Sequence, residues 1–192
     1  PPITAPYTQN FDNTSEPAVD ACWTVINNGS STSSFVGTEN FLSSSAPNSL
    51  EMYYFTGSGE LMIATPLLID FDNAKRIRFE TYDENQTSDL IIGTMSDPSD
   101  VTTFTPYDTI FAADMADDAW DPQQVLFNNY TGTDKYVAFA HGQNNILDQI
   151  YIDNFIYESP TCFDPSNLMV NSSTNTSVDL SWTTGGASNW QI

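Results

Sequence analysis

Positively charged residues are nearly absent from this 192-residue chain, which has 4 Lys and Arg against 25 Asp and Glu and a net charge of −21. Proteins that bind nucleic acid use cations to neutralise phosphates, and so do proteins that bind anionic membranes. The composition therefore argues against both partners. It does not indicate disorder, because 40% of the residues are hydrophobic and 13% are aromatic, which is enough to build a core.

Long hydrophobic runs are absent as well. No window reaches the length of a transmembrane helix, and no basic segment followed by an apolar one marks a secretory signal. The first residues, PPITAPYTQNF, are therefore expected to be either a mature end or a cut inside a longer protein. The acidic balance favours solubility and attracts divalent cations.

Cysteine occurs only twice, at Cys22 and Cys162. The two residues form no CxxC pair, so a zinc site is not expected. An even count in a chain that is poor in Lys and rich in Asn, Ser and Thr is typical of secreted or cell-surface proteins. A disulfide between Cys22 and Cys162 is the favoured interpretation, and two unrelated thiols are the alternative.

Helical periodicity is also rare, and short runs rich in Val, Ile, Phe, Tyr and Thr replace it. The predicted strands cover 22–27, 49–55, 59–68, 76–83, 89–96, 105–112, 123–130, 135–142 and 149–158. A short helical turn is the one exception we expect, within 114–122. Nine short strands with polar turns predict an all-β fold, an antiparallel β-sandwich of the jelly-roll type.

Several predicted strands alternate between apolar and polar side chains. In SLEMYYF, the alternation places Glu51 and Tyr53 on the face opposite the aliphatic residues. In RIRFETYD, it places Arg78, Glu80 and Tyr82 on the opposite face. Such strands cover a core with one face and show the other face to solvent.

The composition changes at Ser159-Pro160, which divides the chain into a domain at 1–159 and a segment at 160–192. The segment contains a predicted strand at 168–171, a second that ends in Trp182 and the start of a third. These pieces are too few to bury a core of their own. The segment resembles the opening of a bacterial fibronectin type III domain, which implies a spacer or interaction module. The matching residues are Cys162, Pro165, Leu168, Ser177, Leu180, Trp182 and Ala187-Ser188-Asn189-Trp190.

The first 159 residues resemble the MAM-like jelly-roll domains of extracellular adhesins, including those of Bacteroidetes. The pieces that carry the resemblance, in this order, are PYTQNFDN, ACWTVIN, SAPNSLEMYY, ATPLLIDFDNAKRIRFETY and IYIDNFIYE. Vertebrate members have more cysteines, so their disulfide pattern is not carried over. The resemblance implies a secreted or cell-surface location.

The same resemblance implies a structural Ca²⁺ where the first and last strands meet. It pairs Asp12 with Asp153 and adds Asn48 as a third side chain, since Ca²⁺ prefers carboxylate, amide and carbonyl oxygens. The alternative is that both Asp residues are capping or surface carboxylates at strand ends. The stretch DFDN at 70–73 begins like an EF-hand loop but lacks the sixth-position glycine and the closing Glu, so we reject that interpretation.

Exposed aromatic residues are the candidates for ligand binding. Trp120, Tyr107 and Tyr130 are predicted to stack on sugar rings. Trp120 lies within an acidic cluster of Asp114, Asp117, Asp118 and Asp121, which is either a second cation site or, in the favoured interpretation, a solvated loop.

Catalytic residues are hard to assemble from this sequence. The single histidine, His141, is preceded by no G-x-S-x-G elbow, and neither cysteine has the context of a nucleophile. A carboxylate pair of the glycosidase type stays open because 25 acids are present. We expect no enzyme but an extracellular adhesion module for glycan or protein partners, joined to other domains of the same chain. The alternatives are an ancillary domain of a secreted hydrolase and a structural spacer in a repeated array.

Overall fold

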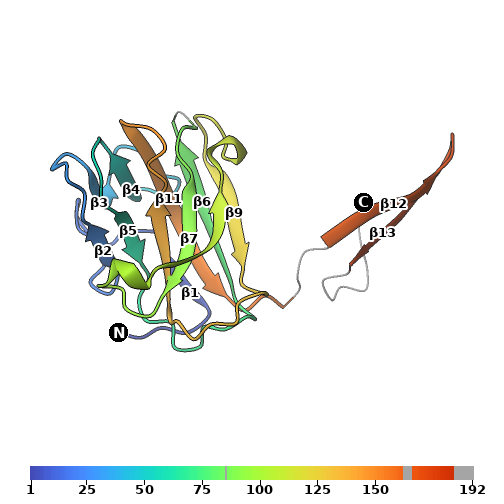
Figure 1. Cartoon of the computed structure of the whole chain (residues 1–192), viewed down its shortest axis with the longest axis horizontal. Coiled ribbons are helices and arrows are strands. Elements are labelled where there is room, and N and C mark those ends of the chain that lie inside the picture. Colours follow the sequence, from blue (N-terminus) through green and yellow to red (C-terminus); the bar gives the residue numbers. More distant parts are fainter. Residues whose placement is uncertain (85, 162–165, 184–192) are drawn as a thin grey trace. The chain divides into compact units, whose positions relative to one another are not determined.

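A computed structural model of the chain describes residues 1–84, 86–161 and 166–183. The chain divides into two compact units, Pro1–Ser159 and Pro160–Ile192. The first unit is a sandwich of two antiparallel sheets, shown in Figure 1, and its described residues contain no α-helix. Over the described part of the chain, no helix has the length and hydrophobicity needed to span a membrane. The predicted all-β sandwich is confirmed.

One sheet has six strands and is built around the longest strand, β11. The first half of β11 pairs with β4 and its second half pairs with β1, while β6 runs along its other edge. The first and last strands of the sandwich therefore meet, as the resemblance implies. The strands of this sheet are β1 (Tyr7–Gln9), β3 (Phe35–Glu39), β4 (Ser49–Tyr54), β6 (Arg76–Asp83), β9 (Asp121–Leu126) and β11 (Asp148–Glu158).

The second sheet has five strands in the order β2-β5-β10-β7-β8. They are β2 (Thr24–Asn27), β5 (Leu61–Ala64), β7 (Leu90–Met95), β8 (Thr105–Ile110) and β10 (Tyr136–His141). Two single-turn 3-10 helices, Val101–Thr103 and Ala112–Asp114, flank β8. A helical turn was predicted within 114–122, and the second 3-10 helix overlaps that segment only at Asp114.

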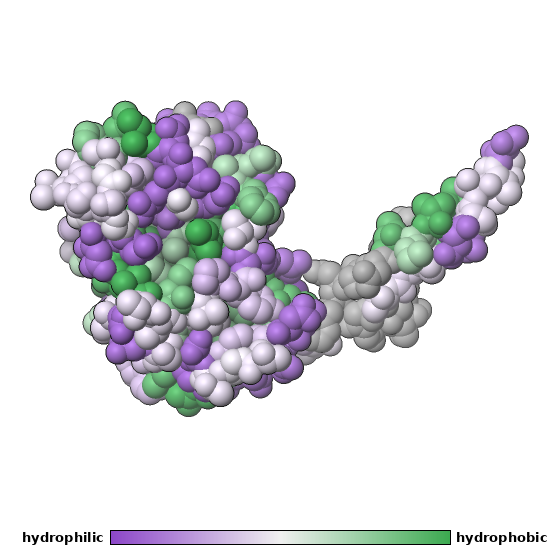
Figure 2. Space-filling view, in the orientation of Figure 1, coloured by the Kyte–Doolittle hydropathy of each residue, from purple (hydrophilic) through white to green (hydrophobic). Residues whose placement is uncertain are grey.

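The outer face of the five-stranded sheet is apolar. Six of its side chains are almost fully buried: Ile26, Met62, Ala64, Met95, Ala138 and Ala140. Partly buried Val101, Phe104 and Tyr136 pack against them. Phe104 lies over Gly93 of β7, where an added Cβ would come within 2.4 Å of its ring. Figure 2 shows hydrophobic residues over β5 and β7 framed by polar ones.

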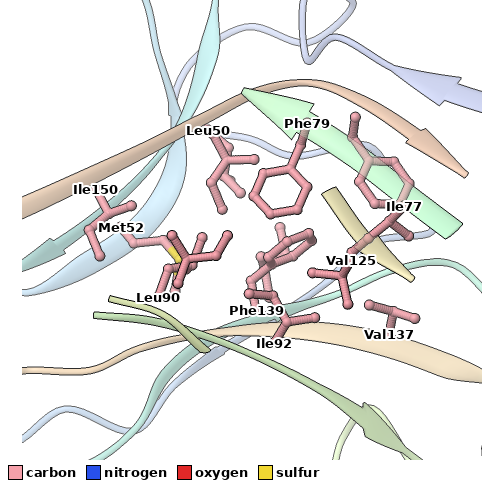
Figure 3. Packing of buried hydrophobic residues seen from close by; sticks show 14 of the residues in the cluster. Leu50, Met52, Ile77, Phe79, Leu90, Ile92, Val125, Val137, Phe139 and Ile150 are labelled. Atoms are coloured by element: carbon pink, nitrogen blue, oxygen red, sulfur yellow. The ribbon is translucent and has the colours of Figure 1, made fainter. Parts of the chain in front are cut away.

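The main core lies between the two sheets. Figure 3 shows aliphatic and aromatic side chains from both sheets pointing toward one another, among them Leu50, Phe79, Ile92 and Phe139. The rings of Phe79 and Phe139 meet edge to face across the sandwich, with centroids 5.0 Å apart. These four side chains are at most 2% exposed. Each contributes about 1.5–3 kcal/mol through burial.

The strand predictions miss two strands, β3 and the three-residue β1, and misplace several boundaries. β3 was not predicted, because FVGTE contains Gly37 and follows a serine-rich stretch. Gly37 is needed there, since a Cβ would lie 2.5 Å from the carbonyl oxygen of Pro17. The Thr38 N–H donates to that same carbonyl at 3.2 Å. The predicted strand at 59–68 ends early at Ala64, and Thr65 N–H then bonds Val137 O outside the strand, at 2.9 Å.

The described part of the second unit is a hairpin made of β12 (Ser166–Ser173) and β13 (Val178–Thr183). Both strands predicted within 166–183 lie in this hairpin. Its apolar side chains are mostly solvent-exposed, with Leu168 at 69% and Val170 at 64%. The first and last parts of the fibronectin-like motif, from Cys162 to Pro165 and from Ala187 to Trp190, lie outside the described residues. The fibronectin type III assignment therefore stays a prediction.

Candidate ligand-binding face

The outer face of the six-stranded sheet places three large side chains in one cross-strand row. Tyr151 of β11 pairs with Glu51 of β4 on one side and with Tyr82 of β6 on the other. Their neighbours along each strand are buried in the core, so these three side chains point outward. Beyond Tyr82, the ring of Trp120 continues this line of side chains. We call its three aromatic members, Tyr151, Tyr82 and Trp120, the aromatic row; Glu51 lies at its β4 end.

The rings of the aromatic row are in direct contact. Tyr82 and Trp120 have ring centroids 5.7 Å apart, and Tyr82 and Tyr151 have centroids 6.0 Å apart at an interplanar angle of 81°. Tyr151 is only 5% exposed, whereas Tyr82 and Trp120 are partly exposed. The row therefore offers solvent-accessible aromatic surface at the Tyr82 and Trp120 end.

The loop that carries Trp120 is docked on the end of β6. Asp117 forms a parallel bridge with Asp83, and the Asp118 N–H donates to Asp83 O at 3.4 Å. The Tyr82 hydroxyl donates to the Asp118 carboxylate. Asp118 adopts φ = 53°, a left-handed conformation that Asp tolerates better than most residues. These contacts hold Trp120 beside Tyr82. Within the predicted acidic cluster, Asp117 and Asp118 therefore fix the position of the loop.

Carboxylates surround the aromatic row. The hydrogen bond to Asp118 and the nearby charges of Glu84 and Asp117 raise the pKa of Tyr82 to about 12. Burial raises the pKa of Tyr151, and carboxylates led by Glu51 raise it further. Both hydroxyls therefore stay protonated at neutral pH and can donate hydrogen bonds.

Glu51 is a buried carboxyl at the β4 end of the row, with 6% of the residue exposed. Burial, assisted by the charge of Glu39, raises its pKa to about 7. The Gln149 amide donates to Glu51 Oε1 at 2.9 Å, which opposes the shift. Near neutral pH, Glu51 is thus divided between its acid and its carboxylate form.

A second aromatic group lies on the same face, toward the other edge strand. Phe35 and Tyr53 are register partners, and their ring centroids are 6.2 Å apart. Phe55 continues the group at 6.3 Å from Tyr53 and is 38% exposed. The face therefore carries aromatic side chains from β3 to the loop before β9.

A polar pocket of about 650 Å³ adjoins Glu80, the next outward residue before Tyr82 on β6. Its walls combine amide, hydroxyl and carboxylate groups with a similar amount of apolar surface, to which Tyr7, Phe155 and Ile156 contribute. It is lined by Tyr7, Thr8, Gln9, Asn10, Asn13, Asp20, Glu80, Asn154, Phe155 and Ile156. Such a pocket can offer many hydrogen bonds to a ligand rich in hydroxyl groups.

Asn154 shapes this pocket through a β-bulge in β11 between Asp153 and Ile156. Its φ is 52°, and its amide donates to Glu80 Oε2 at 2.9 Å. Bulges redirect side chains and are common beside functional sites. Strand alternation points Asp153 away from the core that Ile152 enters, and the extra residue of the bulge returns Phe155 to that core.

Asp153 is completely buried, and the chain itself supplies its partners. Its Oδ2 accepts the N–H groups of Ser44 at 2.9 Å and Ser45 at 2.7 Å. Its Oδ1 accepts the Ser45 hydroxyl at 3.0 Å and the Asn154 N–H at 2.6 Å. Burial raises its pKa, and these donors oppose the shift. Asp153 therefore anchors the β3–β4 loop to β11.

Asp12 and Asn48 contact the other end of that loop. Asp12 Oδ1 accepts the Asn48 N–H at 3.0 Å, and the Asn48 amide donates to Thr14 O at 2.7 Å and to Phe11 O at 3.3 Å. All three predicted calcium ligands thus contact the segment 44–48 or belong to it. Among the described residues, no group of three or more His, Cys, Asp and Glu side chains is placed to hold a metal. The calcium ion stays a prediction.

Tyr107 and Tyr130 lie apart from the aromatic row. They contact each other, with centroids 6.4 Å apart, and pack against Phe127 and Phe71 at the edge of the core. The Tyr107 hydroxyl donates to Leu126 O at 3.1 Å. Of the three predicted stacking residues, the structure brings only Trp120 to the candidate face.

His141 lies in the core at the end of β10 and is 3% exposed. Its Nδ1 accepts the Gln143 N–H at 2.9 Å, and its Nε2 lies 3.4 Å from Asp148 Oδ2. Burial lowers its pKa to about 4, so it is neutral near pH 7. It is a buried structural residue. Cys22 is half-buried, and its predicted partner Cys162 lies outside the described residues.

The DFDN stretch has a structural role. Asp70 Oδ1 accepts the Tyr157 hydroxyl at 2.9 Å, and Asp70 and Asp72 lie 3.5 and 3.6 Å from Lys75 Nζ. These contacts join the β5–β6 loop to β11 and agree with rejecting an EF-hand.

Comparison with known proteins places the fold. No protein-family model and no curated protein sequence matches the chain. Among solved structures, the K2 cleaved adhesin domain of Lys-gingipain matches with a TM-score of 0.63 and 14% identity, over 80% of this chain and 99% of that domain. The sandwich is similar in fold to bacterial adhesin domains. The K1 domain from Porphyromonas gingivalis W83 gives 0.61 and 18% identity, over 81% and 99%.

A third similar structure is a putative sugar binding protein from Bacteroides thetaiotaomicron VPI-5482. It has a TM-score of 0.50 and 11% identity, over 79% of this chain and 92% of that chain. At these identities the likeness is one of fold. The MAM assignment stays a prediction.

The sequence contained a signal for part of the candidate face. The alternation in RIRFETYD placed Tyr82 of the aromatic row on the outer face, and that in SLEMYYF placed its neighbour Glu51 there, although neither was chosen as a ligand residue. Tyr151 could be found in the same way from its buried neighbours Ile150 and Ile152. No local pattern marks the pocket residues, because β1 and the β11 bulge come together only in the fold.

Proposed function

We propose that the sandwich is a non-catalytic, extracellular carbohydrate-binding module that uses the outer face of its six-stranded sheet. The observation that carries this proposal is the aromatic row, which ends in partly exposed Tyr82 and Trp120. Sugar rings stack on such aromatic surface, and the adjoining polar pocket offers hydrogen bonds to sugar hydroxyls. Similarity in fold to adhesin domains supports a binding role but names no ligand.

A catalytic role has less support in this region. His141 is buried and bonded to the chain. On the face, Glu51 and Glu80 accept side-chain amides and Asp118 accepts the Tyr82 hydroxyl. The hypotheses of an ancillary hydrolase domain and of a spacer depend on neighbouring sequence, so they stay predictions.

The test is a glycan array probed with the wild-type chain and with Trp120→Ala. We expect wild type to bind a subset of neutral or basic glycans and Trp120→Ala to lose that binding, because stacking on aromatic side chains supplies much of the affinity. Phe111→Ala is the matched control, since Phe111 is 56% exposed and lies outside the face. An array without binding, or equal loss in both variants, would contradict the proposal.

The calcium ion is a separate proposal, based on the resemblance. It requires oxygens of Asp12, Asp153 and Asn48 to hold the ion beside segment 44–48, where N–H donors now contact the two carboxylates. If it binds there, excess Ca²⁺ raises the melting temperature of wild type relative to EDTA, because a ligand of the native state stabilises it. Asp153→Asn should abolish that difference. Equal melting temperatures of wild type in Ca²⁺ and EDTA would overturn this proposal.

A further inference from the structure

The charge around the aromatic row has one sign. The Tyr82 hydroxyl donates to the Asp118 carboxylate, Glu51 is the register partner of Tyr151, and Asp117 is bridged to Asp83 beside Tyr82. Glu84 and Glu39 add to the negative charge that acts on the two hydroxyls. A ligand that stacks on Tyr82 and Trp120 therefore enters a negative field.

The cations of the chain do not neutralise this field. Lys75 pairs with Asp70 and Asp72, and the Lys135 ammonium donates to Phe71 O at 2.7 Å. Arg76 and Arg78 both bind Glu158, at 2.7 and 2.8 Å. The nearer of the two to the row, Arg78, is four residues before Tyr82 on β6, about 13 Å along an extended strand.

We propose that the aromatic row selects saccharides that carry a free, protonated amine over otherwise identical neutral or N-acetylated saccharides. This inference rests on the proposed glycan-binding function and deepens it. An ammonium group gains from the faces of Trp and Tyr rings and from neighbouring carboxylates, whereas an acetylated amine gains neither. Sulfated, phosphorylated and carboxylated glycans are repelled by the same carboxylates.

The geometry favours an amino sugar over a lysine-rich peptide as the cation. The row continues along β6 to Glu80, which lines the pocket of about 650 Å³ together with Gln9 and Asn10. A lysine side chain would use the rings and the carboxylates but would leave this pocket unfilled. A saccharide with several hydroxyl groups can engage both parts of the face.

The test compares three oligosaccharides of equal length and linkage, made of glucosamine, N-acetylglucosamine or glucose, which differ only in the group at one ring carbon. Calorimetry is run at a pH at which the amine is protonated, at low and at physiological salt. We expect the glucosamine oligomer to bind about tenfold more tightly than the other two, with the advantage reduced by salt.

Charge-removing variants locate the selectivity. Asp118→Asn keeps an oxygen for the Tyr82 hydroxyl and tolerates a positive φ, and Glu84→Gln keeps the shape of its side chain. The double variant should lose most of the glucosamine preference, measured as the ratio of the affinities for the glucosamine and glucose oligomers, so that a general loss of binding is separated from a loss of selectivity. Glu60→Gln is the control, because Glu60 is exposed and does not act on the row, so it changes net charge alone.

The outcomes separate the inference from the proposed function. If neutral and acetylated oligomers bind as tightly as the glucosamine oligomer, the inference is wrong and glycan binding stands. If no oligosaccharide binds but polylysine binds in a manner that depends on Trp120 and Asp118, the partner is a basic protein and both are wrong. A preference that Glu60→Gln reduces as much as the double variant would also overturn the inference.

Discussion

The outer faces of the two sheets follow the same alternation of side chains but carry opposite chemistry. On the five-stranded sheet, small and flexible apolar residues such as Ala138, Ala140 and Met62 are at most 4% exposed. On the six-stranded sheet, the outward positions hold Tyr82, Glu80 and other aromatic or charged side chains. One face is therefore a second core, and the other presents hydrogen-bonding and stacking groups to solvent.

The loops explain how each face came to differ. Phe104 packs over the five-stranded sheet and requires glycine at position 93. On the six-stranded sheet, Asp153 of the central strand β11 holds Ser44 and Ser45, and Asp83 at the end of β6 holds the loop of Trp120. A loop that lays an apolar side chain on a sheet extends the core, whereas these two loops are held by polar contacts and leave Tyr82 and Trp120 partly exposed.

The largest effect is expected for Asp153→Ala. The substitution leaves two loop N–H groups and a serine hydroxyl without their acceptor, which should lower the free energy of unfolding by about 3–5 kcal/mol. Urea denaturation measures this loss. Asp153→Asn is the control, since its amide oxygen keeps part of the contacts and should lose less. A loss below about 1 kcal/mol for Asp153→Ala would show that the loop does not depend on this carboxylate.

Met62→Ala tests the apolar face. Met62 is fully buried on the outer side of β5, so truncation should lower the free energy of unfolding by about 2–4 kcal/mol. Thermal melting and urea denaturation would show this. If Met62→Ala changes the free energy of unfolding by no more than about 0.5 kcal/mol, as surface substitutions usually do, the outer face of the five-stranded sheet is not a second core.

Glu51→Gln tests the charged face through pH. The folded-state pKa of Glu51 is about 7, above its ordinary value of 4.5, so the folded state binds the proton more tightly. Stability from this group is fully present below about pH 4.5 and is lost as pH rises through 7. Wild type should therefore lose about 1–2 kcal/mol over this window relative to Glu51→Gln, after allowance for solvent screening. If the free energies of unfolding of wild type and Glu51→Gln change with pH in parallel, the raised pKa of Glu51 is contradicted.

The repeating features of the fold could be predicted from sequence. Alternation in β4 and β6 identified the inward and outward residues, and the meeting of the first and last strands was expected from the resemblance. β3 was missed because its glycine and flanking serines are typical of a loop, and only the contact with Pro17 explains the glycine.

The site was less predictable, because its parts are far apart in the sequence. Trp120 was chosen from its exposed, acidic setting, whereas its contact with Tyr82 depends on the bridge between Asp83 and Asp117. Tyr107 and Tyr130 had the same local appearance but pack at the core edge. Asp153 was recognised as a carboxylate in need of a partner, and the partner found in the structure is the backbone at 44–45.

The most direct test of the account measures binding and stability together in Trp120→Ala and Met62→Ala. Using a glycan that wild type binds, we predict that Trp120→Ala loses at least about tenfold in affinity and less than about 1 kcal/mol in stability. Met62→Ala should lose about 2–4 kcal/mol in stability and keep wild-type affinity at a temperature where it is folded. The reverse pattern, with binding lost in Met62→Ala and kept in Trp120→Ala, would place the ligand on the five-stranded sheet and contradict the account.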